Sequence, residues 1–402
     1  MKVEILKLDH FGRGITYINN KICFIENTLP GEVVKIKIIK EAKKYLIGKV
    51  IDYYVLSDDR IVDVCLYSDI CGGCNLGHLK FDKENDFKCM KVKEILKKFG
   101  GVDDSKIKDV TSIDEYNYRN KITLHGKDNK LGYYESGSND VFNVDECLLA
   151  TSKINEVLVE ARKTVEECNV NEVVIKCSND LDEVMVCING EVDDYSNLNN
   201  CVDTLIINNE VVLGDGSIIS KIGDKKFYVS KDSFFQVNTK LTKLLYDEVL
   251  NVLKDVKAKK VLDLYCGTGT IGIYISDYCL EVVGVDYSES GIKDANKNKE
   301  LNNIKNIKFI CDKVENVIDE FNDFDMVVVD PPRAGLDSKT IENIKRIGSE
   351  TLVYISCDPS TLGRDLKELE SDYEVLVVKP YNMFPRTYHI ENFVLLRRKS
   401  NG

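Results

Sequence analysis

The chain has 402 residues, 43% of them hydrophobic and 30% charged, with a formal net charge of −12. These values are typical of a globular protein of two or three domains, and they argue against a surface that binds nucleic acid non-specifically throughout. No apolar run approaches the roughly 20 residues of a membrane span and no signal peptide is evident, so we expect a cytoplasmic protein with no membrane partner, and a monomer.

Residues 1–55 alternate between apolar and polar side chains, as short strands do. The candidate strands are 3–6, 14–18, 21–25, 32–39 and 45–51. The first 50 residues hold ten Lys or Arg against five Asp or Glu, so this part is basic within an acidic chain. Five short strands with a basic surface predict an OB-like barrel that binds single-stranded nucleic acid. A barrel that serves only solubility or protein interaction is the alternative.

The next part, 56–230, is predicted to be rich in short strands, at 172–176, 183–188 and 204–208. A helical piece at about 78–100 could pack on the part that follows. Four of the fourteen cysteines stand out by their spacing: Cys65, Cys71 and Cys74 form C-x5-C-x2-C, and Cys147 lies far downstream. Spacing alone leaves an iron–sulfur cluster, a zinc ion and no metal open.

From 231 to 402, strands and helices alternate, which predicts a doubly wound parallel sheet. The strand 260–265 leads into the glycine turn of Gly267 and Gly269, and Asp286 ends the next strand. This pattern fits a nicotinamide dinucleotide and also S-adenosylmethionine. Asp263, inside the first strand, favours S-adenosylmethionine because its carboxylate could receive the methionine ammonium group.

Three further residues lie at predicted strand ends, where ligands bind in such sheets. Asp330 follows a strand and precedes two prolines, and Cys357 lies between a strand and a helix that Asp358 could cap. The helix dipole there favours the thiolate, so we predict that Cys357 is a nucleophile, with a merely packed cysteine as the alternative. Glu391 precedes a buried strand, and burial would raise its pKa into the range of a useful base, unless it is exposed.

Several strings together resemble the RNA (uracil-5-)-methyltransferase family, in order along nearly the whole chain. They are His10-Phe-Gly-Arg-Gly14 (similar to a TRAM domain), the four cysteines, Phe234-Phe-Gln236-Val-Asn238, Asp263 to Gly269, Asp330-Pro-Pro-Arg333, Ser356-Cys-Asp-Pro359 and His389-Ile-Glu391. The chain is most similar to the bacterial 23S ribosomal RNA enzymes with a TRAM domain and a [4Fe-4S] cluster. The resemblance implies a TRAM barrel at 1–55, a β-rich iron–sulfur domain at 56–230 and a Rossmann-like class I methyltransferase domain at 231–402.

By the same resemblance, Cys357 is the nucleophile, Glu391 is the base, and the four cysteines hold the [4Fe-4S] cluster. The residues that would line the S-adenosylmethionine and uracil site are Gln236, Tyr265, Gly267, Gly269, Thr270, Asp286, Asp312 and Asp330. Some members have Asn at the position of Thr270 and Glu at that of Asp286, so fine contacts there can differ.

The implied chemistry is addition of the Cys357 thiolate to uracil C6, methyl transfer to C5, and removal of the C5 proton by Glu391. The base must be flipped out of the RNA to reach such a pocket. Three alternatives remain: a transfer-RNA T-loop uracil methyltransferase, an NAD-linked iron–sulfur oxidoreductase, and an RNA-binding protein with an inactive site.

Overall fold

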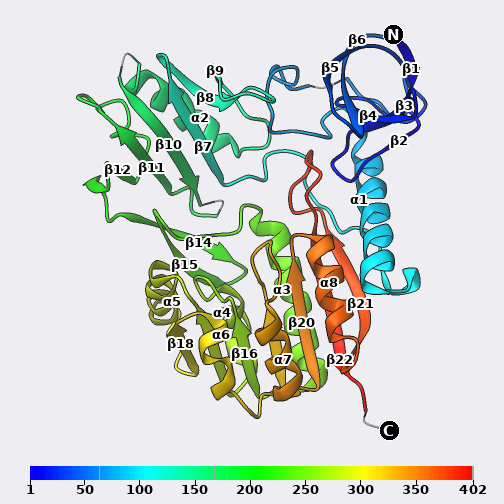
Figure 1. Cartoon of the computed structure of the whole chain (residues 1–402). Coiled ribbons are helices and arrows are strands. Elements are labelled where there is room, and N and C mark those ends of the chain that lie inside the picture. Colours follow the sequence, from blue (N-terminus) through cyan, green and yellow to red (C-terminus); the bar gives the residue numbers. More distant parts are fainter. Residues whose placement is uncertain (63, 167, 179, 401–402) are drawn as a thin grey trace.

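The computed structural model describes residues 1–62, 64–166, 168–178 and 180–400. Three sheets and a two-stranded hairpin make up its β-structure. Figure 1 shows a small barrel above α1, a second sheet with α2 beside it, and a large sheet with helices below both.

The N-terminal barrel is a six-stranded sheet in the order β1-β5-β6-β4-β3-β2. Its strands are β1 (Lys2–Glu4), β2 (Lys7–Leu8), β3 (Gly14–Ile18), β4 (Lys21–Ile25), β5 (Val33–Glu41) and β6 (Tyr45–Val55). The predicted strand at 3–6 is thus replaced by two short ones, because the chain changes its partner strand at buried Ile5: Glu4 still pairs with β5, whereas the Leu6 amide donates to the Ile15 carbonyl of β3. The other four predicted strands are confirmed.

The second sheet has the order β13-β12-β11-β10-β7-β8-β9, and helix α2 packs on β10. Its elements are β7 (Lys121–Lys127), β8 (Lys130–Tyr134), β9 (Val141–Asn143), α2 (Ser152–Thr164), β10 (Val170–Cys177), β11 (Val184–Gly190), β12 (Thr204–Ile207) and β13 (Glu210–Leu213). The three strands predicted here are confirmed. The helix α2 is an addition to the predicted elements; it buries Ile154, Val157 and Leu158 against the sheet.

The third sheet has the order β18-β17-β16-β19-β20-β22-β21, with the first five strands parallel and β22 antiparallel to both neighbours. Its strands are β16 (Lys260–Leu264), β17 (Glu281–Asp286), β18 (Ile307–Cys311), β19 (Met326–Val329), β20 (Thr351–Ser356), β21 (Tyr373–Tyr381) and β22 (Glu391–Arg398). The predicted doubly wound sheet is confirmed, including its closing antiparallel pair.

Helices cover both faces of the third sheet, and one apolar cluster lies between the sheet and the helices on each face. They are α3 (Thr239–Val256), α4 (Thr270–Ile275), α5 (Glu289–Leu301), α6 (Val314–Val317), α7 (Ser338–Ile347) and α8 (Pro359–Leu369). The hairpin β14 (Ser217–Ile222) and β15 (Lys225–Ser230) packs on α3 and α5. In the part of the chain that the structure describes, no helix is long and apolar enough to cross a membrane.

Helix α1 (Phe81–Ile95) joins the barrel to the third sheet. It continues into a π-helical turn (Leu96–Gly100) that packs on α8, so that Val92 and Leu96 belong to the same apolar cluster as β20. Figure 1 shows α1 running from beneath the barrel alongside β21 and α8. The long connection between the first two sheets therefore lies against the third sheet and its helices.

Candidate active site

The edge of the third sheet where β19 and β20 end gathers the three predicted reactive side chains. Asp330 follows β19, Cys357 follows β20, and Glu391 begins the antiparallel strand β22 at the same edge. Ser356 pairs with Asn392 in the ladder, and the Asn392 side-chain amide donates to the Ser356 carbonyl at 3.2 Å. Strand register therefore places Cys357 beside Glu391, and we call this group of three the catalytic edge.

The turn after Cys357 folds as the sequence predicts. Asp358 is the N-cap of α8, with its carboxylate accepting from the Ser360 amide at 2.7 Å, and Pro359 occupies the first helical turn. The expectation that this position favours the thiolate is wrong. Burial, followed by the nearby Glu391 and Asp330, raises the pKa of Cys357 to about 11, and Arg333 opposes this only in part. Burial, followed by two carboxyl groups from other strands, outweighs the effect of the helix end on the Cys357 pKa.

The predicted base is buried, as expected. Glu391 is 7% exposed, and burial together with Asp330 raises its pKa well above the usual range of a glutamate. Burial and the Asp286 charge raise the pKa of Asp330 to about 7. A buried carboxyl with a raised pKa is a stronger base once ionised, which suits removal of a proton from carbon.

The glycine turn after β16 has the backbone shape that a bound nucleotide-like ligand needs. Tyr265, Gly267 and Gly269 all have positive φ, of 64°, 53° and 75°. A side chain at Gly269 would meet the Phe309 ring at 2.4 Å, so glycine is required there. The Asp286 carboxylate accepts from the Gly267 amide at 2.9 Å and so closes the turn against β17.

Asp263 is the predicted receiver of a ligand ammonium group, and its surroundings fit that role. It is fully buried; one carboxylate oxygen accepts from the Gly272 amide at 3.1 Å, and the other has no partner among the described residues. Burial raises the pKa of Asp263 to about 8. An unpaired buried carboxylate oxygen is costly, and a cationic ligand group would compensate it.

The remaining predicted cofactor residues are spread along the same edge. The Thr270 hydroxyl bonds to the Tyr246 hydroxyl at 2.7 Å, and Asp312 accepts from the Lys313 amide. The ring of Tyr265 packs against the apolar cluster on the α7 and α8 face, and burial raises its pKa to about 12. Tyr265 is therefore held in the core while its backbone forms the turn.

Gln236 lies where the second sheet meets the part of the chain that forms the third sheet. Its carbonyl accepts from the Asn120 side chain at 3.0 Å, and the Asn120 amide donates to the Val237 carbonyl at 3.1 Å. Nearby, Phe234 is 69% exposed. These bonds join Asn120, just before β7, to the segment before α3.

A cavity of about 840 Å³ opens at this junction, and we call it the cysteine cavity. Its lining includes Cys65, Cys71, Cys74, Cys147, Arg119, Lys121, Lys176, Phe234, Arg333 and Phe384. Burial, with Cys147 and Cys65 nearby, raises the pKa of Cys71. All four predicted metal ligands thus line one cavity, but within the described ranges no three His, Cys, Asp or Glu residues are close enough to hold a metal ion.

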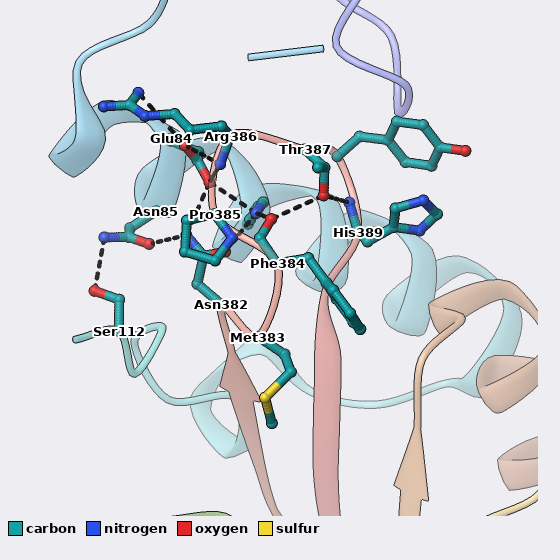
Figure 2. A network of polar contacts seen from close by, with 12 residues as sticks. Glu84, Asn85, Ser112, Asn382, Met383, Phe384, Pro385, Arg386, Thr387 and His389 are labelled. Carbon is teal, nitrogen blue, oxygen red and sulfur yellow. Dashed lines mark hydrogen bonds and ion pairs between the residues drawn. The ribbon is translucent and has the colours of Figure 1, made fainter. Parts of the chain in front are cut away.

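The segment 382–390, between β21 and β22, is a part of the site that the sequence analysis did not single out beyond His389. Its polar contacts with α1 are drawn in Figure 2. The ring centroids of Tyr388 and His389 lie 4.2 Å apart, and that of Phe11 in the barrel lies 5.2 Å from that of Tyr388. Burial, followed by the positive charge of Arg333, lowers the pKa of His389 to about 4, so the imidazole is neutral at pH 7.

Two family models match the sequence. The model described as tRNA (Uracil-5-)-methyltransferase matches residues 208–399, and the TRAM domain model matches residues 1–51. An uncharacterized RNA methyltransferase of Clostridium acetobutylicum is 35% identical over 99% of this chain and 96% of its own length. One from Staphylococcus epidermidis is 31% identical over 98% of this chain and 97% of its own length.

A solved structure also resembles this one along nearly its whole length. The tRNA (uracil-54, C5)-methyltransferase of Pyrococcus abyssi, in complex with S-adenosyl-L-homocysteine, superposes with a TM-score of 0.82 at 25% identity. The match covers 98% of this chain and 100% of that one, so the barrel and the second sheet are included. The comparisons favour S-adenosylmethionine over a nicotinamide dinucleotide as the ligand of the glycine turn.

Proposed function

This chain belongs to the RNA (uracil-5-)-methyltransferase family, and from that premise we propose that it methylates C5 of a flipped uridine through a covalent bond between Cys357 and uracil C6. The observation that carries the proposal is the catalytic edge, where strand register sets Cys357 beside Glu391. Uracil C5 is a poor nucleophile, and addition of a thiolate at C6 makes it an enolate that can accept a methyl group.

Each residue of the catalytic edge has a task in this reaction. The Cys357 thiol would give its proton to water, and the thiolate would add to C6, which places negative charge on the C5–C4–O4 enolate. C5 then takes the methyl group from the sulfonium of bound S-adenosylmethionine, which leaves as a neutral thioether. The ionised Glu391 carboxylate takes the proton from C5, the C5–C6 double bond forms again, and the C6–S bond breaks to release the Cys357 thiolate. Burial, followed by the Asp330 charge, keeps the Glu391 pKa high, which makes the ionised carboxylate a stronger base. Half-buried Gln236 would contact the uracil carbonyls.

Replacement of the base tests this sequence of steps. Glu391→Gln leaves the thiol in place but cannot take the C5 proton, so a covalent enzyme–RNA adduct should accumulate and appear as a shifted band on a denaturing gel. RNA that carries 5-fluorouridine should trap the same bond in the unmodified enzyme. Absence of both conjugates would refute the covalent route.

S-adenosylmethionine supplies the methyl group on its sulfonium. Three features of the glycine turn and its surroundings support its binding here. The Asp263 oxygen without a partner would receive the ammonium group, the Gly267 and Gly269 turn leaves room for the ligand, and Asp286 would hold the ribose hydroxyls. The Asp263→Asn variant should weaken cofactor binding in calorimetry while leaving the fold intact.

We propose 23S ribosomal RNA as the substrate, because the TRAM domain and the four cysteines together resemble the enzymes that act on it. Transfer RNA is the second candidate, since the full-length structural match is to an enzyme named for uridine 54 of tRNA. Mass-spectrometric mapping of 5-methyluridine in both RNAs from a deletion strain decides between them. Loss from ribosomal RNA alone supports the first, and loss from transfer RNA alone supports the second.

The cysteine cavity is proposed to hold a [4Fe-4S] cluster. Four thiols line one cavity, the Gly73 amide lies 3.4 Å from the Cys71 sulfur, and thiolate sulfurs are the usual ligands of such clusters. The four cysteines are not part of the catalytic edge, so the cluster would shape the RNA surface and take no part in the reaction. Protein purified without oxygen should contain about four iron atoms per chain, and colourless, iron-free protein would refute the assignment.

A further inference from the structure

One face of α1 holds the segment 382–390, which leads directly into Glu391. Glu84, Lys88 and Lys91 lie one helical turn apart on this face and are all buried. Figure 2 shows Glu84 and Asn85 of α1 facing the labelled residues from Asn382 to His389. We call Glu84, Lys88 and Lys91 together the α1 clamp.

Glu84 makes the largest number of contacts with the segment. Its carboxylate accepts from the Arg386 amide at 3.0 and 3.1 Å and from the Asn382 side chain at 2.8 Å. Arg386 has a φ of 67°, a conformation that costs energy in a residue with a side chain. The paired bonds to Glu84 hold the backbone in that conformation.

The two lysines fix the carbonyl groups on either side. Lys88 donates to Glu84 at 2.8 Å, to the Asn382 side chain at 2.6 Å and to the Phe384 carbonyl at 3.1 Å. Lys91 donates to the Tyr388 carbonyl at 2.8 Å. Burial lowers the pKa of Lys88 to about 8, and Glu84 opposes that shift, so Lys88 is protonated at neutral pH.

The contacts of the clamp end just before the reactive residue. Tyr388, the last residue it holds, lies three positions before Glu391, and the intervening Ile390 is fully buried in the cluster that also contains Val92 of α1. Few freely rotating backbone bonds therefore lie between the residues that the clamp holds and Glu391. The ladder between β20 and β22 keeps the Glu391 backbone beside Cys357, so a shift of the segment would act on the direction in which the Glu391 side chain enters the site at the start of β22.

We propose that the α1 clamp positions Glu391 for removal of the C5 proton, with Lys88 as the principal positioning residue. This inference rests on the proposed role of Glu391 as the base. Geometry at a reacting centre governs rate steeply, so loss of the clamp should slow proton removal much more than the earlier addition of Cys357.

The test separates formation of the Cys357–RNA adduct from its breakdown, in single-turnover reactions of the full-length enzyme with RNA and S-adenosylmethionine. In Lys88→Met, adduct formation should stay within about twofold of the unmodified enzyme while breakdown slows about tenfold or more. The adduct should then accumulate, as in Glu391→Gln. Lys91→Met removes a single bond at the edge of the clamp and should give the same split with a smaller effect.

A matched control lies on the same helix. Lys83 pairs with Asp86 on the exposed side of α1, so Lys83→Met removes a helix ion pair without touching the segment 382–390, and both rates should stay unchanged. The proposal would be overturned if Lys88→Met and Lys91→Met slowed adduct formation and adduct breakdown equally. It would also be overturned if Lys91→Met changed neither rate. If Lys88→Met does not fold, Lys91→Met decides.

The outcomes also separate this inference from the function on which it rests. Adduct that accumulates in Glu391→Gln but not in the clamp variants would reject the positioning role alone. No adduct in Glu391→Gln, and none with 5-fluorouridine RNA, would reject the covalent mechanism itself.

Discussion

The catalytic edge and the cysteine cavity hold their reactive side chains in different ways. At the edge, Cys357 and Glu391 sit at the ends of paired strands, so the backbone ladder sets their separation. In the cavity, Cys65, Cys71 and Cys74 lie in a stretch without regular strands or helices, and Cys147 comes from another loop. The first site is set by strand pairing, whereas the positions of the four thiols in the second are set by loops.

The largest effect expected at the catalytic edge follows from removing the nucleophile. Cys357→Ala should abolish methylation, because no other group can add to uracil C6, while S-adenosylmethionine binds with unchanged affinity in calorimetry. Cys279→Ala, at the opposite end of the same sheet, is the matched control and should keep full activity. Retained turnover in Cys357→Ala would mean that the edge is not the reaction centre.

The cysteine cavity should fail in a different manner. Cys71→Ser is expected to lower the iron content from about four per chain to below one and to reduce RNA methylation. Its affinity for S-adenosylmethionine should stay within about twofold, because the glycine turn lies in another sheet. Cys168→Ser changes a cysteine outside the cavity and should leave iron and activity intact. A matching loss of cofactor affinity in Cys71→Ser would show that the two regions are not independent.

The pH dependence of adduct formation is a further test of the catalytic edge. The pKa of Cys357 depends on side chains that come together only in the folded protein. With a pKa of about 11, the thiolate fraction rises about tenfold per pH unit below that value, so adduct formation should rise with similar steepness from about pH 6 to 9. Single-turnover rates with 5-fluorouridine RNA measure it. A flat profile would mean that the thiol is already ionised in the resting enzyme.

The smallest expected effect is a loss of stability from one hydrogen bond that lies outside the catalytic edge. The Tyr354 hydroxyl donates to buried Asp365 at 2.6 Å, and Tyr354→Phe should cost about 1 to 2 kcal/mol of unfolding free energy, since Asp365 loses one of its donors. Methylation should persist, because the register of β20 and not this bond places Cys357. Tyr17→Phe, with an exposed ring, is the control for denaturant unfolding. A loss of activity as large as that of Cys357→Ala would contradict this account.

The sequence predicted most of the third sheet because buried parallel strands are continuous apolar runs, each followed by an acid, a glycine turn or a capped helix. It also predicted the burial of Glu391. Helix α2 was missed although Ile154, Val157 and Leu158 have helical spacing, because the surrounding region was interpreted as a set of strands.

Other features had no local signal. The pKa of Cys357 depends first on its burial and then on Glu391 and Asp330, which are far away in the chain, so an argument from the adjacent helix end gave the wrong direction. The bond between Lys88 and Asn382 joins residues 294 positions apart. A lysine four residues after a glutamate is usually an exposed helix pair, and only the packed fold shows that this one is buried.

The position of β22 has a consequence for incomplete or nicked chains. It comes after β21 in the chain yet lies between β20 and β21, so neither of those strands has its final neighbour until residues 391–398 are in place. A chain cut within the segment 382–390 would lose Glu391, the proposed base, and would also leave two apolar strands with open backbone groups, which invites pairing with other molecules. Such a fragment should therefore precipitate rather than persist as a soluble, inactive competitor for RNA.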